Sequence, residues 1–174
     1  MNSLSKDSRK ADVLPVEEPS KYLTFVLAGR HYGINILRVR EILEYIEVTP
    51  MPMMPTFIAG VINLRGNAVP VIDLAVRLGI EHADISRRTC IVVVELHTEL
   101  GLINIGVIVE AVSKVVDFNK ADIEPVPKLG TNIRTDFIEG MGNVEGDFLV
   151  LLNIDRLLTE EDAQSLAGLT LADS

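Results

Sequence analysis

Apolar and polar positions alternate in short runs along most of the chain, and glycine-containing turns separate the runs. Residues 22–27 form the first such run, and after Gly29-Arg30 a second run occupies residues 31–36. Paired runs of β-forming residues around a turn predict a β-hairpin. The next stretch, 37–43, has mixed apolar spacing that fits either a strand or one to two helical turns.

One hairpin pattern occurs twice, in residues 57–78 and again 80 positions later in residues 137–158. The two copies carry identical residues at Phe57 and Phe137, Ile58 and Ile138, Gly60 and Gly140, Asn63 and Asn143, and Gly66 and Gly146. Apolar alternation alone would not place glycines and asparagines in step. Each copy therefore predicts a β-hairpin whose tight Gly-Asn or Gly-Asp turn uses the positive φ that glycine allows.

Loops and helix ends are predicted from local signals. Three prolines within residues 49–55 exclude a helix interior and a central strand, so this stretch is expected to be an apolar loop. Asp73 is placed to cap a short helix that Gly79 closes. Thr159 to Asp162 form a capping box, which predicts a C-terminal helix that ends near Gly168.

The repeat extends upstream at a smaller offset, because residues 33–36 align with residues 106–109. We therefore expect two intertwined modules, at about 21–80 and 88–154, each with about five short strands. Closure into a barrel would remove the edges that so short a sheet exposes. The predicted fold class is mainly β: two five-stranded β-barrels packed together, with short helices and a C-terminal helix in residues 159–174.

Composition fits a globular chain, since 48% of the 174 residues are hydrophobic and 24% are charged. The net charge of −9 and the absence of a basic patch argue against binding to nucleic acid or to an anionic membrane. Cys90 is the single cysteine, so no disulfide framework is expected, and it is interpreted as a buried structural thiol in a reducing compartment.

Residues 1–20 are rich in charge and have no apolar core, which excludes a secretory signal and predicts a disordered tail. No apolar run approaches the roughly 18 residues that a transmembrane helix needs. We therefore expect a soluble, cytoplasmic protein with no direct membrane insertion.

Catalytic, metal and cofactor motifs are poorly supported. His31, His82 and His97 lack the spacing of metal ligands and do not adjoin a nucleophile motif. The segment 60–66 has neither of the glycine patterns that bind phosphates. The acidic residues 160–162 are explained by the helix dipole. We therefore expect no catalytic residues, no metal and no cofactor.

Two charged positions exchange sign together between the copies: Glu41 aligns with Lys114, and Arg65 aligns with Glu145. If the positions touch within each module, Glu41–Arg65 and Lys114–Glu145 are the same salt bridge reversed. An exposed bridge contributes only about 0–1 kcal/mol to stability. The expected role of the bridge is to keep a surface in the geometry that a partner recognises.

The methionines of the 49–55 loop allow two interpretations. Met51, Met53 and Met54 are flexible and polarisable, and the neighbouring prolines lower the entropy lost on binding, so the loop could be an adaptable contact surface. Alternatively, these side chains fill the seam between the two modules.

Several motifs together carry a family resemblance. They are Tyr32-Gly33-Ile34, Val39-x-Glu41-Ile42, Phe57-Ile58-x-Gly60-Val61-x-Asn63-Leu64-Arg65-Gly66 and Pro70-Val71-Ile72-Asp73-Leu74. With them the chain resembles the CheW-like domain family of chemotaxis coupling proteins over roughly residues 22–158. The C-terminal module resembles the family more by pattern than by motif.

The resemblance implies two SH3-like barrels, no enzymatic activity, and a scaffold that bridges the cytoplasmic tip of chemoreceptors to the histidine kinase CheA. In the family the receptor tip docks in the groove between the barrels, and the regulatory domain of the kinase associates barrel to barrel in membrane-associated arrays. Carried over by motif, Val39, Glu41, Gly60, Asn63 and Arg65 would line or support the partner-binding region.

Three alternatives stay open at this stage. A CheW-like adaptor could serve a non-flagellar signalling pathway, and a sensor barrel could hold a small molecule in the groove between the modules. An enzyme could draw acid and base groups from Asp73, Glu110 and His31. A groove lined mainly by Val, Ile and Met would favour an adaptor, whereas convergent carboxylates or a histidine in a closed pocket would favour an enzyme.

Overall fold

The structure is a computed structural model that describes residues 19–81, 84–126 and 135–172. Most of the tail predicted at 1–20 lies outside these ranges. Ser20, however, already belongs to the first strand.

The described elements are mainly strands, which confirms the predicted fold class. In chain order they are β1 (Ser20–Leu27), β2 (Arg30–Asn35), the 3-10 turn η2 (Ile36–Arg38), β3 (Val39–Glu44), β4 (Ile58–Leu64), β5 (Asn67–Asp73), α2 (Leu74–Arg77), β6 (Cys90–Thr98), β7 (Gly101–Val109), β8 (Ala111–Phe118), η3 (Lys120–Asp122), β9 (Ile123–Glu124), η4 (Thr135–Phe137), β10 (Ile138–Val144), β11 (Asp147–Leu152), η5 (Ile154–Arg156) and α3 (Glu160–Ala172). The undecided stretch 37–43 divides between η2 and β3.

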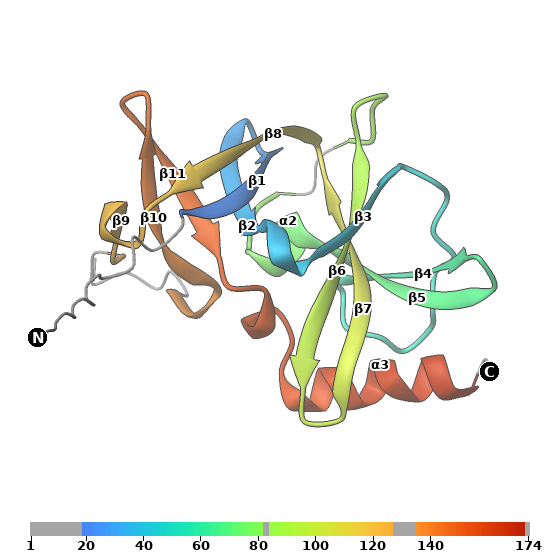
Figure 1. The fold of residues 1–174 in the computed structure, drawn as a ribbon. Coiled ribbons are helices and arrows are strands. Elements are labelled where there is room, and N and C mark those ends of the chain that lie inside the picture. The colour runs from blue at the N-terminus through green and yellow to red at the C-terminus, as the bar shows by residue number, and fades with distance from the viewer. Residues whose placement is uncertain (1–18, 82–83, 127–134, 173–174) are drawn as a thin grey trace, which may run out of the picture.

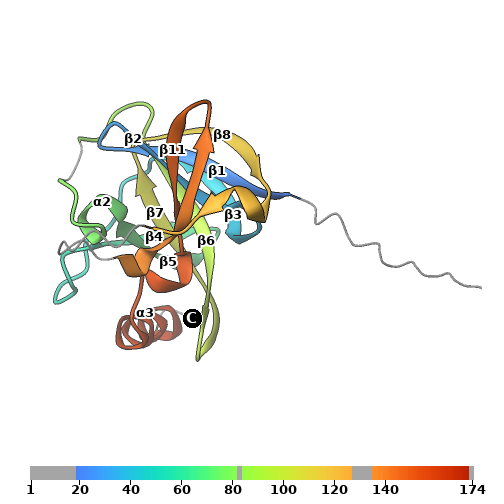
Figure 2. The same ribbon diagram turned by 90° about the vertical axis from the view of Figure 1, so that its left-hand side faces the viewer.

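The strands form two curved sheets that pack side by side (Figure 1). Barrel 1 has five strands, the predicted number, and their order is β3-β6-β7-β5-β4. Barrel 2 has the order β8-β1-β2-β11-β10-β9, so the short β9 gives it one strand more than predicted. Both views place α3 at one end of the molecule, beside the tip of the β6–β7 hairpin (Figures 1 and 2).

The two barrels exchange strands. Residues 21–80 supply β1 and β2 to barrel 2 and β3 to β5 to barrel 1, whereas residues 88–154 supply β6 and β7 to barrel 1. The exchange follows the repeat. In sequence order, β1 to β5 of the first copy correspond to β6, β7, β8, β10 and β11 of the second copy. When each strand of barrel 1 is replaced by its counterpart, the strand order of barrel 2 without β9 results.

Parallel pairing joins the exchanged strands at matching repeat positions. Val71 of β5 lies beside Gly106 of β7, and Leu151 of β11 lies beside Gly33 of β2. Val71 and Leu151 are 80 positions apart in the sequence, and Gly33 and Gly106 are 73 positions apart. The structure thus confirms the alignment of the two copies and explains why it needs two offsets.

Each repeated hairpin turns through two residues with positive φ. In the first copy these are Arg65 and Gly66, at 52° and 87°, and in the second they are Glu145 and Gly146, at 52° and 90°. The side-chain oxygen of Asn63 accepts a hydrogen bond from the Gly66 amide at 2.8 Å. Two positive φ values match a turn that continues the strand twist. The hairpin is confirmed, but the predicted Gly-Asn or Gly-Asp turn is wrong by one residue.

The short helix α2 begins and ends where the sequence predicts. The Asp73 carboxylate accepts a hydrogen bond from the Val76 amide at 3.2 Å, and Gly79 leaves the helix with a φ of 76°. Both features satisfy backbone groups that a helix end leaves without partners.

The capping box of α3 also forms. The Thr159 hydroxyl accepts from the Asp162 amide at 3.0 Å, and the Asp162 carboxylate accepts from the Thr159 amide at 3.2 Å. The helix nevertheless continues through Gly168 to Ala172, so its predicted end is wrong. Glycine costs only about 1 kcal/mol in a helix interior, which packing of the helix can offset.

The largest buried cluster contains residues of both barrels and fills the seam between them. It includes Leu23, Phe25, Ile34, Ile72, Val92, Val94, Ile105, Val107 and Leu152. Smaller clusters fill barrel 1 (Ile62, Val69, Val71 and Ile91) and barrel 2 (Tyr22, Phe118, Leu149 and Leu151). The seam is therefore the main core, and it fixes each barrel on the other.

The methionines of the 49–55 loop have different surroundings. Met54 packs against the seam core, Met51 is half-buried, and Met53 is fully exposed with a positive φ of 61°. Cys90 is half-buried rather than buried, and it packs against the same core.

Candidate partner-binding surface

A two-pronged ion pair joins Glu41 of β3 to Arg65 in the turn after β4. The guanidinium donates from Nη1 to Oε2 at 3.1 Å and from Nη2 to Oε1 at 2.5 Å. The Glu41 side chain is 27% exposed and that of Arg65 is 70% exposed. Hydrogen bonding to Arg65 lowers the pKa of Glu41, and the same contact raises the pKa of Arg65. The contact predicted from the repeat is thus confirmed.

The position of this ion pair gives it a structural meaning. β3 and β4 are the first and last strands in the sheet order of barrel 1. The Glu41–Arg65 pair therefore reaches between the two edge strands. It presents a pair of opposite charges, joined by two hydrogen bonds, on the exterior of the barrel.

Gly60 and Asn63 shape this surface through the backbone. Gly60 has a φ of 147°, and a Cβ atom at this position would lie 2.0 Å from the carbonyl oxygen of Thr49. The close approach lets Thr49 and Val61 exchange two backbone hydrogen bonds of 2.9 Å, which hold the start of the 49–55 loop on β4. Asn63 fixes the turn that carries Arg65.

Val39 completes the set of five residues predicted for partner binding. It begins β3, pairs with Val94 of β6 and is half-buried against the seam core. It lies two positions before Glu41 on the same strand. The structure thus places all five residues on β3, on β4 or in the turn after β4, with Glu41 and Arg65 as the charged members.

The sign-reversed pair behaves differently. Among the described residues no ion pair or hydrogen bond joins the Lys114 ammonium to the Glu145 carboxylate, so this second predicted contact is wrong. Both residues are exposed, and both line one hollow of barrel 2. Equivalent places in the two barrels therefore carry a closed ion pair in one case and two separate charges in the other.

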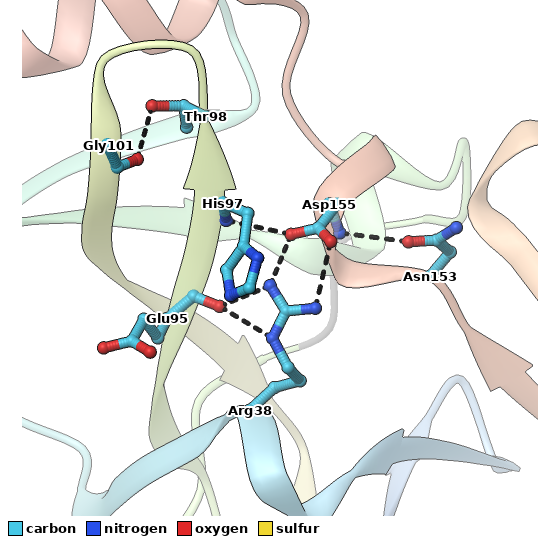
Figure 3. A network of polar contacts seen from close by, with 7 residues as sticks. All are labelled: Arg38, Glu95, His97, Thr98, Gly101, Asn153 and Asp155. Carbon is cyan, nitrogen blue, oxygen red and sulfur yellow. Dashed lines mark hydrogen bonds and ion pairs between the residues drawn. The ribbon is translucent and has the colours of Figure 1, made fainter.

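A polar network that the sequence did not predict connects the barrels (Figure 3). Arg38, in the η2 crossover, donates from Nη1 to Asp155 of η5 at 3.0 Å, and a second guanidinium nitrogen also contacts this carboxylate. Arg38 further donates to the Glu95 carbonyl of β6, at 3.1 Å from Nε and 2.8 Å from Nη2. The His97 amide donates to Asp155 at 3.0 Å.

The ionisation of Asp155 reflects this network. Partial burial acts to raise the pKa of Asp155, but the hydrogen bonds from Arg38 and from the His97 amide outweigh burial and bring the pKa below its ordinary value. The hydrogen bond to Asp155 correspondingly raises the pKa of Arg38. Neither a motif nor a periodicity could reveal a pair that is 117 residues apart in sequence.

Arg77 of α2 lies at a place where the two copies of the repeat meet. Its guanidinium lies 4.5 Å from the ring centroid of Phe57 and 4.8 Å from that of Phe137, which are equivalent residues of the two copies. Its Nε donates to the Leu157 carbonyl at 2.5 Å. Cation–π contacts of this kind contribute to stability where the charge is partly desolvated. The sequence predicted the repeat of the phenylalanines but not this shared cation.

A groove of about 540 Å³ lies between α2 and barrel 2. Its lining consists of Tyr32, Val76, Arg77, Leu78, Gly79, Ile80, Phe137, Ile138, Val150 and Leu152. This lining is apolar apart from one arginine and one tyrosine, and it contains neither a carboxylate nor a histidine. By the criterion set from the sequence, it favours an adaptor.

The three residues considered for an acid and base site do not converge. Asp73 and Glu110 line a hollow of only about 20 Å³, where Asp73 caps α2 and Glu110 accepts from the Ala28 amide. His31 lines the separate hollow of barrel 2. His82 lies outside the described residues.

The described residues lack two further kinds of functional feature. They contain no group of three or more His, Cys, Asp or Glu side chains that could hold a metal ion. No helix formed by these residues has the length and apolar character needed to cross a membrane.

Comparisons with known proteins give a consistent result. A sequence model described as CheW-like domain matches residues 21–162. The chain is 34% identical over 142 residues to a chemotaxis protein CheW of Klebsiella aerogenes, covering 82% of this chain and 83% of that protein. It is 31% identical over 143 residues to a chemotaxis protein CheW of Rhizobium meliloti, covering 82% and 90%.

A solved structure shows the same likeness. The crystal structure of scaffolding protein TtCheW from Thermoanaerobacter tengcongensis matches with a TM-score of 0.74 and 35% sequence identity, covering 87% of this chain and 94% of that chain. The family model, the relatives and the fold therefore agree, and the chain belongs to the CheW-like domain family.

Proposed function

We propose that this protein is a non-catalytic adaptor that couples chemoreceptors to the histidine kinase CheA in chemotaxis signal transduction. The observation that carries the proposal is membership of the CheW-like domain family over 21–162, together with relatives named as chemotaxis proteins and a structural neighbour named as a scaffolding protein. The apolar groove and the rigid Glu41–Arg65 surface fit an adaptor, because both suit recognition of a macromolecule.

The partners of the proposed adaptor are the cytoplasmic tip of a chemoreceptor and the regulatory domain of CheA. Val39, Glu41, Gly60, Asn63 and Arg65 form the proposed partner-binding region of barrel 1. Glu41 and Arg65 offer charges in a fixed geometry, which favours specificity and correct register over raw affinity. Gly60 and Asn63 support that geometry through the backbone.

An adaptor transmits a signal only through differential contacts. A change in the receptor alters kinase activity if the two receptor states bind the adaptor, or the kinase that it holds, with different free energies. Two barrels that share one core suit this role, because the packed core fixes their two surfaces relative to each other. The protein is proposed to act in the cytoplasm, where receptor arrays recruit it to the membrane.

Calorimetric titration of the purified protein against the CheA regulatory domain and a receptor-tip fragment tests this function. The variants are Arg65→Glu, Glu41→Arg and the double exchange. Each single variant should weaken binding by about tenfold, and the double exchange should recover part of the loss because the ion pair can reform with reversed sign.

Lys21→Glu provides a matched control, since Lys21 forms an exposed ion pair with Asp117 on barrel 2 at 3.0 Å. This variant makes the same charge change away from the proposed region and should bind like the wild type. Failure of the wild-type protein to bind either partner would overturn the proposed function. Equal losses in all three single variants would instead show a non-specific charge effect.

A further inference from the structure

Each barrel has a hollow between the tips of two diverging hairpins. In barrel 1 the hollow has a volume of about 550 Å³ and is lined from residues 64–70 and 100–104. In barrel 2 it has a volume of about 720 Å³ and is lined mainly from residues 29–32 and 144–150, with a contribution from β8. In the repeat, residues 64–70 align with residues 144–150, and the segment 29–32 aligns with the segment around 100–104. The hollows are therefore equivalent places in the two barrels.

A helix packs at the edge of one of the two hollows. In Figure 1, α3 begins beside the tip of the β6–β7 hairpin and runs below the β4–β5 hairpin of barrel 1. Leu166 of α3 lines the barrel 1 hollow and is only 1% exposed, and Ala163, one turn earlier, is also buried. α3 therefore packs one apolar side chain at the edge of the barrel 1 hollow, while Leu100 and Leu102 in the same lining remain 58% and 61% exposed.

No helix of the described residues contributes to the lining of the barrel 2 hollow. By the repeat, the counterpart of α3 would follow α2, but there the chain passes through residues 79–89 directly into β6, and the described part of this segment contains no helix. Phe148 in the lining is 55% exposed, and Met141 and Val116 beside it are half-buried. Apolar side chains gathered in one open hollow are typical of an interaction site.

The two sides of the barrel 2 hollow carry opposite charges. Arg30 of β2 and Lys114 of β8 lie on one side, whereas Glu145 and Asp147 of the β10–β11 hairpin lie on the other. All four are exposed, and no ion pair between described residues joins the two sides. The equivalent charges of barrel 1 are closed into the Glu41–Arg65 pair, so only barrel 2 leaves both signs open to a partner.

We propose that the barrel 2 hollow is a docking site for an amphipathic helix of a partner protein. The apolar face of that helix covers Phe148, and it takes the place that Leu166 of α3 occupies at the edge of the barrel 1 hollow. Its two flanks carry opposite charges: acidic residues face Arg30 and Lys114, and basic residues face Glu145. The site lies on a different barrel from the partner-binding region proposed above and does not depend on it.

Three designed helical peptides test this proposal. All share one apolar face with leucines at positions i, i+3 and i+7, and they carry one acidic and one basic flank, two acidic flanks, or two basic flanks. Each is titrated into the full-length, isotope-labelled protein and followed by amide chemical shifts. The mixed-flank peptide should give saturable shifts confined to the barrel 2 hollow, with the other two peptides about tenfold weaker.

A charge-reversed protein sharpens the test. Arg30→Glu combined with Lys114→Glu makes both sides acidic, and this variant should prefer the peptide with two basic flanks. Lys21→Glu combined with Lys120→Glu makes the same change in net charge outside the hollow and should keep the preference for the mixed-flank peptide. Both pairs of positions are exposed, so the variants should unfold like the wild type.

Three results would overturn the proposal. The first is the absence of saturable shifts with the mixed-flank peptide up to about 1 mM, which is the limit of useful affinity. The second is a set of shifts centred on the barrel 1 hollow. The third is self-association in sedimentation with concentration-dependent shifts at the barrel 2 hollow, because a second copy of the chain would then be the occupant. Binding to kinase or receptor fragments is measured separately, so either proposal can fail alone.

Discussion

Gly60 shows how a single residue can hold a surface together. Its φ of 147° and its close approach to the Thr49 carbonyl leave no room for a side chain. We expect Gly60→Ala to lower the free energy of unfolding by about 2–4 kcal/mol, because the variant combines backbone strain with a clash against backbone atoms. Urea denaturation followed by circular dichroism measures this loss.

Gly66 is the control for that prediction. It also has a positive φ, but a Cβ atom added to it would meet nothing within 4 Å. Gly66→Ala should therefore cost only the conformational term, about 1–2 kcal/mol. If alanine were no worse at position 60 than at position 66, the close approach of Thr49 would not be the reason for glycine.

The lowered pKa of Asp155 predicts that the stability of the protein depends on pH. Its pKa is lower in the folded protein than the ordinary value of 3.8, so its contribution is present above that value and is lost as the pH falls through the folded pKa. We expect Asp155→Asn to lower the free energy of unfolding by about 1–2 kcal/mol at neutral pH, because the half-buried Arg38 loses its charged partner.

The comparison of the two proteins at low pH decides the cause. The difference between wild type and Asp155→Asn should shrink as the pH falls from about 4 through the lowered folded-state pKa, where the wild-type carboxylate also becomes neutral. Unfolding free energies measured from pH 2 to pH 7 test this. A difference that stays constant across the whole range would mean that the carboxylate charge does not stabilise the network.

At the scale of elements, the two hollows differ in whether a helix packs at their edge. Leu166 is buried on the inner side of α3, whereas Phe148 in the barrel 2 hollow is 55% exposed. Leu166→Ala should cost about 2–4 kcal/mol of stability, since it leaves a cavity. Phe148→Ala should cost less than about 1 kcal/mol, because the ring is already in contact with water.

Thermal unfolding of both variants measures this contrast. Equal losses for Leu166→Ala and Phe148→Ala would show that the barrel 2 hollow is closed in solution. That result would also remove the structural basis for a docking site there.

At the scale of the whole molecule, strand exchange should make the two barrels fold as one unit. Barrel 1 needs β6 and β7 from residues 88–154, and barrel 2 needs β1 and β2 from residues 21–80. Each fragment alone would expose sheet edges and half of the seam core, which is the largest apolar cluster. We therefore expect each fragment to be unfolded alone and the two to form a complex when they are co-expressed.

Amide spectra of the separate and co-expressed fragments check this expectation. Dispersed resonances from the co-expressed pair, and collapsed resonances from each fragment alone, are the expected result. The full chain should likewise unfold in a single transition by two independent probes. A cooperative transition in fragment 21–80 alone would show that the exchange is not needed for folding.

The sequence alone determined the local structure. Hairpins, the Asp73 cap, the Thr159 capping box and the proline-rich loop depend on residues only a few positions apart, and periodicity and side-chain chemistry report on such distances. The repeat also revealed the Glu41–Arg65 contact, because two coupled sign changes carry information about proximity. The same reasoning failed for Lys114 and Glu145, since equivalent positions need not keep the same separation in both copies.

Only the tertiary structure decided how the elements combine. The pattern of an amphipathic strand shows that the strand is paired and half-buried, but it does not show which copy of the repeat supplies the partner strand. The exchange of hairpins between the barrels therefore could not be predicted from the sequence. The Arg38–Asp155 pair and the Arg77 stack between two phenylalanines arise from that exchange. Long-range contacts depend on the choice among partners of similar pattern, and packing of the shared seam core makes that choice.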